Sequence, residues 1–220
     1  MHNIRNIINW CLSIIFQERC LGCRRNGEIL CALCIARLRQ AEREMPSGIN
    51  ACYDYRDPVV RNAIWSLKYY KHKYLGEVLG KLIYENMIED ISDLSSLSRG
   101  QSILVVPVPI SANRNRKRGY NQAKSIAQSF CLASGKETLE LRDDLAIKIL
   151  DTEPQARIAN RAKRLRNIKD AFNVIRPEVV KGRIVIIIDD VTTTGATISE
   201  VMRVVKSSGA KKVLGYAFAH

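Results

Sequence analysis

The sequence IVIIIDDVTTTGATISEVM, residues 184–202, joins an apolar segment to a run of acidic and hydroxyl side chains. Residues 184–188 are all β-branched, which is typical of a strand covered on both faces in a parallel sheet. Asp189 and Asp190 follow this strand, and residues 196–207 have the apolar spacing of a helix. The stretch therefore predicts a strand, a polar loop and a helix, the repeating unit of an α/β fold.

The same alternation extends over most of the chain. Strands are expected at 51–56, 102–107, 184–188 and 211–219, weak strand signals occur at 145–150, and helices are expected at 57–70, 75–90, 122–133 and 196–207. Asp57 and Pro58 have the residue types of a helix N-terminus, whereas residues 93–101 and 110–122 are expected to be loops. The sequence thus predicts an α/β domain over residues 51–220, with a mainly parallel sheet flanked by helices.

Residues 1–50 form the other predicted domain, a small cysteine module. Its segment CLGCRRNGEILCALC, residues 20–34, contains two CxxC pairs separated by seven residues. Thiolates at this spacing can supply the four ligands of a tetrahedral zinc ion, which leaves no open position for catalysis. We therefore expect structural Zn²⁺ on Cys20, Cys23, Cys31 and Cys34. Reduced buried cysteines and a redox pair are the alternatives.

The charge balance favours partners that carry several negative charges. The 220 residues include 35 Lys and Arg against 22 Asp and Glu, a formal net charge of +13. Nucleic acid, an acidic membrane surface and phosphorylated small molecules all fit this charge. Charge alone does not choose among them.

One segment near the N-terminus is a candidate for targeting the chain to a membrane. Residues 7–16, IINWCLSIIF, are apolar, but they are too short to span a bilayer and lack a small-residue cleavage site. A buried or amphipathic helix is expected there, with an interfacial membrane helix as the alternative. The seven cysteines, an odd number without a secretory signal, argue against a disulfide framework. We expect a cytoplasmic protein with no transmembrane segment.

The residues after the strand at 184–188 have the chemistry of a sugar-phosphate site. Ligands of open parallel sheets bind outside the carboxyl ends of the strands. There, Asp189 and Asp190 can accept hydrogen bonds from diol hydroxyls or hold a hydrated cation, and the loop 192–197 offers backbone N–H groups and hydroxyls at a helix N-terminus. No GxxxxGK[ST] motif is present, which disfavours a P-loop NTPase, and no GxGxxG follows a strand, which disfavours a dinucleotide-binding fold. The alternative is a buried strand whose acids only cap the next helix.

A basic segment follows the strand at 102–107. Residues 113–124, NRNRKRGYNQAK, carry five cations and no acid. If this segment stands at the same sheet edge as Asp189, its cations can stabilise a diphosphate leaving group. A solvated loop or a patch for nucleic-acid phosphates is the alternative.

Two segments resemble known families. VIIIDDVTTTGAT, residues 185–197, resembles the motif of type I phosphoribosyltransferases that binds phosphoribosyl pyrophosphate (PRPP). This resemblance implies catalytic roles for Asp189 and Asp190 at the ribose hydroxyls, with Mg²⁺ accompanying the pyrophosphate. It also implies that the 5′-phosphate is held by Thr192, Thr193, Thr194, Gly195, Ala196 and Thr197.

The second segment, PVPISANRNRKRGYNQA at residues 107–123, is similar to the PVP…RxRxRG[FY]NQA signature of the ComF family. The paired CxxC motifs, residues 67–80 and residues 164–172 agree with that family in order. Ser111 and Ala112 depart from it, because the family often has His-Pro there. The resemblance implies a phosphoribosyltransferase-like protein associated with natural competence and DNA uptake, with pyrophosphate bound by Arg114, Arg116 and Arg118.

Two functions fit these features. The first is a phosphoribosyltransferase that uses PRPP and Mg²⁺, whose acceptor and oligomeric state the sequence does not specify. The second is a non-catalytic, PRPP-sensing protein that handles single-stranded DNA and works with the competence machinery. Residues 152–169 are expected either to form a lid that brings Arg157, Arg161 or Arg164 to the site, or to be a solvated basic helix.

Overall fold

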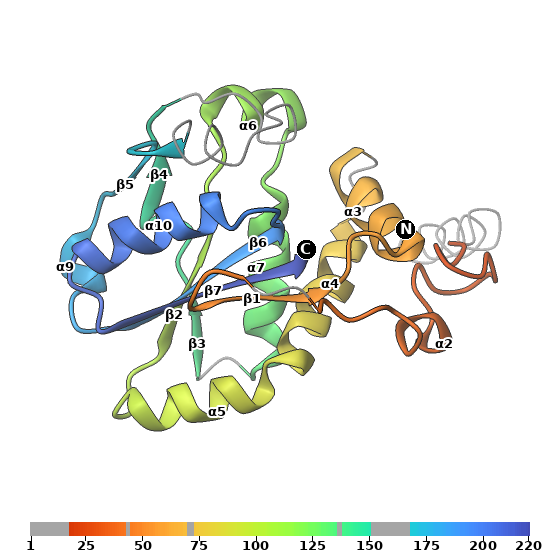
Figure 1. Ribbon diagram of the computed structural model, residues 1–220, viewed down its shortest axis with the longest axis horizontal. Helices are drawn as coiled ribbons and strands as arrows, with labels where there is room; N and C mark the ends of the chain where they lie inside the picture. The colour runs from red at the N-terminus through yellow and green to blue at the C-terminus, as the bar shows by residue number, and fades with distance from the viewer. Residues whose placement is uncertain (1–17, 43–44, 70–72, 136–137, 151–167) are drawn as a thin grey trace, which may run out of the picture. The chain divides into compact units, whose positions relative to one another are not determined.

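The computed structural model describes residues 18–42, 45–69, 73–135, 138–150 and 168–220 (Figure 1). The chain divides into two compact units, Met1–Leu38 and Arg39–His220. The first unit contains helix α2 (Ala32–Ile35) and the paired CxxC motifs, and the second contains every described strand. Strand β1 (Ile49–Tyr53) lies within the second unit. The domain limits expected from the sequence, 1–50 and 51–220, stay a prediction.

A five-stranded parallel sheet forms the centre of the second unit, in the order β1-β7-β6-β2-β3. Its other strands are β2 (Ile103–Pro107), β3 (Leu139–Leu141), β6 (Ile184–Val191) and β7 (Lys212–Ala219). Every pairing in this sheet is parallel. Strands β4 (Ala146–Lys148) and β5 (Phe172–Val174) form a separate antiparallel pair. The prediction of an α/β domain with a mainly parallel sheet is confirmed.

Helices cover both faces of this sheet (Figure 1). The described helices of the second unit are α3 (Pro58–Tyr69), α4 (Lys73–Asn86), α5 (Ile88–Leu97), α6 (Ala112–Arg118), α7 (Gln122–Ala133), α9 (Pro177–Val180) and α10 (Ala196–Ser207). The chain moves from β2 to β3 in one direction along the sheet and from β6 to β7 in the other. Since such connections are right-handed, α7 and α10 lie on opposite faces. Helix α7 packs on β2 and β6 and against α4, which also contacts β7, while α10 packs on β6 and β7.

Strands β2 and β6 are neighbours from which the chain departs in opposite directions. Their register pairs Leu104 with Val185 and Pro107 with Ile188. Residues 103–107 and 184–188 of these strands are buried, so the hydrophobic effect stabilises the sheet at this pair. A crevice between diverging connections is where open α/β sheets bind ligands, outside the carboxyl ends of the strands. This point in the sheet therefore locates the candidate site.

Several predicted elements have the expected limits. Helices α7 and α10 span residues 122–133 and 196–207, as the apolar spacing predicted. Asp57 caps α3, because its Oδ1 accepts a hydrogen bond of 2.7 Å from the Val59 N–H. Such a cap satisfies a backbone donor that the first helical turn leaves open.

Residues 112–118 correct the prediction of a loop over 110–122, since they form helix α6. Ser111 provides the N-cap, where its Oγ accepts a 3.4 Å hydrogen bond from the Arg114 N–H. Gly119 ends the helix with φ +79°, a conformation that glycine adopts at low cost. Because the segment carries many like charges, it was predicted to be a loop, and Ser111 and Gly119 were not recognised as helix caps.

Two further boundaries differ from the prediction. Residues 93–97, expected in a loop, belong to α5, which buries Ile91 and Leu94. A 2.7 Å hydrogen bond from Tyr216 Oη to Asp90 Oδ2 ties α5 to β7. Strand β6 continues to Val191 and so includes the acid pair that was expected to follow it, because Asp189 and Val191 stay paired with β7.

No helix in the described ranges is long and apolar enough to cross a membrane. The apolar segment at 7–16 lies outside those ranges.

Candidate functional site

A cavity of about 630 Å³ opens at the carboxyl ends of β2 and β6. Its walls come from three parts of the second unit: the end of β6 with the loop to α10, residues 108–123 including α6, and the last turn of α3. Lys148, Ile168 and Phe172, from the region of the β4–β5 pair, complete the lining. The cavity thus lies where the strand order predicts a ligand site.

The two carboxylates of β6 have different surroundings. Asp190 is 8% exposed, and its Oδ1 accepts a 2.7 Å hydrogen bond from the Val191 N–H. Asp189 is less buried, and its Oδ1 accepts a 2.9 Å bond from the Asp190 N–H. Burial raises the pKa of the Asp189 carboxyl well above its usual range, and the neighbouring Asp190 charge raises it further. A state in which both carboxyl groups are ionised is therefore unfavourable unless a cation lies nearby.

Lys68, in the last turn of α3, supplies a cation to this pair. Its Nζ lies 3.0 Å from Asp190 Oδ2, and its side chain is 20% exposed. Burial acts to lower the pKa of Lys68, but the Asp190 charge and hydrogen bond outweigh burial, so the pKa is raised. Lys68 is therefore charged at neutral pH.

The loop from Thr192 to Gly195 is fixed at both ends. The Thr192 N–H donates a 2.9 Å hydrogen bond to the Ala219 carbonyl of β7, and the Ala196 N–H donates a 3.4 Å bond to Thr194 Oγ1. Gly195 has φ +76°, and a Cβ there would lie 2.9 Å from Pro46 Cγ. Both conformation and space therefore require glycine at the start of α10. The dipole of this twelve-residue helix favours an anion in the cavity.

Helix α6 forms the basic wall. Arg114, Lys117 and Arg118 line the cavity, and Arg118 Nη1 donates a 3.2 Å hydrogen bond to Gln122 Oε1. Residues three and four apart share one face of a helix. Asn121 holds this wall to the sheet, because its Nδ2 donates a 3.0 Å bond to the carbonyl of Val108, next to β2. Three cations thus stand across the cavity from the acid pair.

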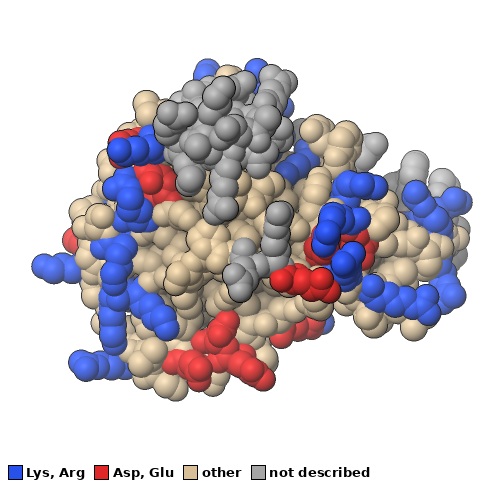
Figure 2. Space-filling model, in the orientation of Figure 1, with Lys and Arg blue, Asp and Glu red and all other residues tan. Residues whose placement is uncertain are grey.

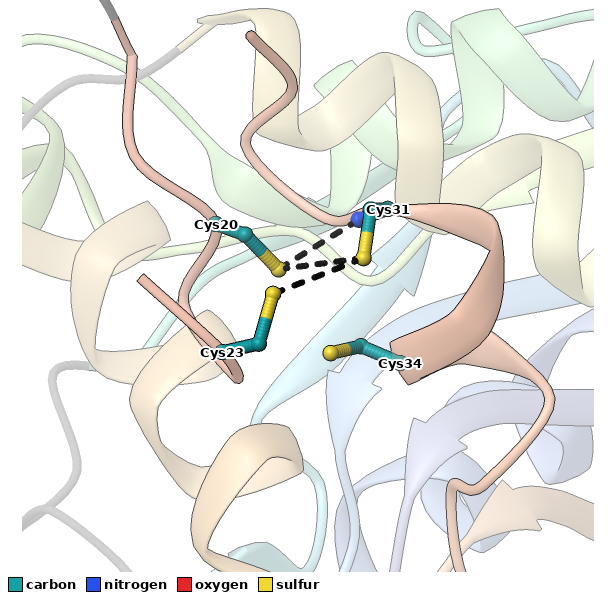
Figure 3. Close-up of side chains that lie close together, drawn as sticks. All are labelled: Cys20, Cys23, Cys31 and Cys34. Carbon is teal, nitrogen blue, oxygen red and sulfur yellow. Dashed lines mark hydrogen bonds between the residues drawn. The ribbon is translucent and has the colours of Figure 1, made fainter. Parts of the chain in front are cut away.

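The four cysteines of the first unit form a separate cluster (Figure 3). Their Sγ atoms all lie within 4.8 Å of one another, and Cys31 Sγ lies 3.7 Å from Cys20 Sγ and 3.8 Å from Cys23 Sγ. Burial acts to raise the pKa of Cys20, yet hydrogen bonds, foremost from the Cys31 N–H, lower it to about 6. Because metals bind thiolates, the cluster is a group of donors that could hold a metal ion.

Comparisons with known proteins agree with this geometry. The phosphoribosyl transferase domain family matches residues 116–219. The DNA utilization protein YhgH of Escherichia coli K12 is 27% identical over 160 residues, which cover 73% of this chain and 66% of that protein. Competence protein ComFC of Streptococcus pneumoniae R6 is 27% identical over 143 residues, which cover 65% of this chain and 57% of that protein. The chain is therefore similar to these DNA utilization and competence proteins, and its residues 116–219 match the phosphoribosyl transferase domain.

One further relative and one solved structure are also similar to this chain. Competence protein F of Haemophilus influenzae Rd is 26% identical over 71% of this chain and 66% of its own length. The chain thus spans between 57% and 66% of the length of these curated relatives. A glutamine PRPP amidotransferase of B. subtilis, solved with ADP and GMP, has a TM-score of 0.37 and 20% identity over 64% of this chain and 25% of that chain. A score of this size adds nothing to the fold, which rests on the strand order and the domain match.

The structure brings most of the predicted site residues together. The cavity is lined by Asp189, Asp190, Thr192, Thr193, Thr194, Gly195, Ala196, Thr197, Arg114 and Arg118. Arg116 is not in the lining: two residues along a helix from Arg114 it faces another way. Arg157, Arg161 and Arg164 of the expected lid lie outside the described residues. The ligands assigned to all these residues stay predictions.

Lys68 is a site residue that sequence analysis missed. It was counted only as part of an expected helix over 57–70 and of the family-like segment 67–80, with no role at the site. A signal was present, because Lys68 lies one turn after Ile64 and next to Leu67, both of which are fully buried. A lysine at the edge of an apolar stripe requires a buried partner, and the sequence alone did not identify that partner as Asp190.

Proposed function

We propose that this chain is a member of the ComF family and that it binds PRPP, together with Mg²⁺, in the cavity at the ends of β2 and β6. The observation that carries the proposal is the meeting of an acid pair, a helix N-terminus and a basic helix in one cavity of about 630 Å³. The three groups suit the ribose hydroxyls, the 5′-phosphate and the diphosphate of PRPP, respectively. Small-molecule sites usually occupy roughly 300–1,000 Å³, so the size is suitable.

The reaction we propose is transfer of the phosphoribosyl group to an acceptor nucleophile. The bond from the anomeric carbon to the diphosphate oxygen breaks, the electron pair leaves with the diphosphate, and the acceptor forms the new bond to that carbon. Arg114 and Arg118 stabilise the charge that develops on the leaving oxygen. Asp189 and the loop 192–197 hold the ribose phosphate in place, so positioning and charge stabilisation carry the catalysis.

Mg²⁺ is proposed to accompany the diphosphate and to neutralise part of its charge. Hard cations take oxygen ligands, and the Asp189 carboxylate, which is the less buried of the pair and lines the cavity, is a ligand of that type.

A second candidate function, single-stranded DNA handling, is favoured by an aromatic pair on α3. Trp65 and Tyr69 are 55% and 60% exposed, and their ring centroids lie 4.6 Å apart. Exposed aromatic rings are platforms on which the bases of a single strand stack. On the face in Figure 2, Lys and Arg side chains gather along the left edge and are sparse over the middle, so this second function rests on the aromatic pair. This role would connect the protein to DNA uptake and to the competence machinery in the cytoplasm.

We also propose that the cysteine cluster holds a structural Zn²⁺. A tetrahedral site with Zn–S distances of about 2.3 Å places neighbouring sulfur atoms about 3.8 Å apart, and two of the observed separations are 3.7 and 3.8 Å. Four cysteine ligands complete the coordination, so this ion would stabilise the first unit without taking part in catalysis.

PRPP binding can be measured by calorimetric titration in the presence of Mg²⁺. We expect Asp189→Asn to weaken binding about tenfold or more, because hydrogen bonds to a charged group contribute about 1.5–3 kcal/mol. Asp93→Asn, which neutralises an exposed acid of α5, is the matched control and should bind like the wild type. A wild type that shows no PRPP binding, or two variants that bind equally well, would disprove the proposed site.

DNA binding can be followed by the fluorescence anisotropy of a labelled oligothymidylate. Affinity should fall steeply as salt rises, and Trp65→Ala should lower it about tenfold, because one stacked base contributes about 1–3 kcal/mol. Leu132→Ala removes an equally exposed apolar side chain on α7 and should have little effect. Binding that is absent, or that does not respond to salt, contradicts this second function.

Elemental analysis of the purified protein should find about one zinc ion per chain. Cys31→Ser should lose most of this zinc, whereas Cys131→Ala, which changes a buried cysteine of α7 outside the cluster, should retain it. The zinc proposal fails if wild-type protein with four reduced cysteines is folded and free of metal.

A further inference from the structure

Lys68 reaches the candidate site from an element far from it in sequence. It stands in the last turn of α3, lines the cavity, and pairs with Asp190 Oδ2 at 3.0 Å. Tyr120 Oη, which follows α6, donates a hydrogen bond to the carbonyl of Leu67, the residue before Lys68. The end of α3 is thus attached to the basic wall as well as to the acid pair. Lys68 is held in place from two sides.

The contacts of Asp190 argue against its acting as a free acceptor for ribose hydroxyls. Its Oδ1 is occupied by the Val191 N–H at 2.7 Å and its Oδ2 by Lys68, and the residue is 8% exposed. Asp189 is less buried, and its Oδ1 takes the Asp190 N–H. The two neighbouring acids therefore suit different tasks: Asp189 faces a ligand, and Asp190 orients a cation.

Lys68 and Arg118 bring two positive charges into the same cavity. Arg118 is oriented by Gln122, which is 2% exposed and accepts its hydrogen bond through Oε1 at 3.2 Å. The charge of Arg118 acts to lower the pKa of Lys68, so the two cations are close enough to repel each other. An anion placed between them would relieve this repulsion. Each cation is thus positioned by a buried polar partner, as a binding site for a polyanion requires.

We infer that Lys68 binds the diphosphate group of PRPP and that Asp190 is the positioning residue that holds it there. This inference rests on the proposed function. A lysine ammonium has three donors, so the bond to Asp190 leaves two for anionic oxygens. The diphosphate is then gripped from both sides of the cavity, by Lys68 of α3 and by the arginines of α6.

Three ligands separate this role from a purely structural ion pair: PRPP, pyrophosphate and ribose 5-phosphate, each titrated calorimetrically with Mg²⁺. Lys68→Met should weaken binding of PRPP and of pyrophosphate at least tenfold and change ribose 5-phosphate binding less than twofold. Lys68→Arg, which keeps the charge, should recover most of the loss. Lys81→Met is the control, because Lys81 is 69% exposed in its pair with Glu85 on α4, and it should match the wild type.

Asp190 is tested in the same titrations. Asp190→Asn should reproduce the pattern of Lys68→Met, with the loss confined to ligands that carry a diphosphate. The double variant should be no weaker than either single variant within about twofold, because residues that act as a unit are not additive. Thermal unfolding of each variant shows whether it is folded. Lys68→Met alone leaves the Asp190 carboxylate buried without a cation and can be unstable for that reason. The double variant removes this charge as well, so it keeps the test valid.

The inference is overturned if Lys68→Met binds pyrophosphate like the wild type, or if Asp190→Asn weakens ribose 5-phosphate as much as PRPP. Either result leaves the proposed PRPP site standing, because PRPP still binds to the wild type. A wild type that binds none of the three ligands instead overturns the proposed function itself.

Discussion

The parallel pairing of β2 with β6 is the constraint on which the candidate site depends. Its register sets Pro107 beside Ile188, so the chain that leaves β2 and the acid pair of β6 emerge at one edge of the sheet. Since side chains alternate between faces, a shift of one residue would turn each side chain of β6 to the opposite face and move the acid pair by about 3.3 Å relative to Pro107. Hydrophobic burial along the strands therefore fixes a polar site at their ends.

Much of this arrangement was predictable because the signals were local. The β-branched run at 184–188 predicted a covered strand, and Gly195 followed by apolar spacing predicted α10. The cysteine cluster was predictable for the same reason, since its four ligands lie within residues 20–34. Helix α6 was missed because its caps, Ser111 and Gly119, stand at the ends of a segment whose charge suggested a loop.

What the sequence could not supply were the contacts between distant segments. Lys68 and Asp190 meet only because α3 packs near the end of β6, and no local pattern encodes that contact. The helical form of residues 112–118 also changed which cations line the cavity. The RxRxR spacing suggests three equivalent arginines. A helix instead presents Arg114, Lys117 and Arg118 to the cavity and turns Arg116 away. The residue types therefore predicted the chemistry of the site, but which residues line the cavity depended on tertiary structure.

The PRPP cavity at the ends of β2 and β6 is tested most directly by amide hydrogen exchange, measured with and without Mg²⁺ and PRPP. Ligand contact should slow exchange in the loop and first turn at 192–198 and in the basic wall at 112–123, while α5, whose residues do not line the cavity, should exchange at the same rate in both samples. Protection that is absent from both cavity segments, or equal in α5, would contradict a PRPP site at this edge of the sheet.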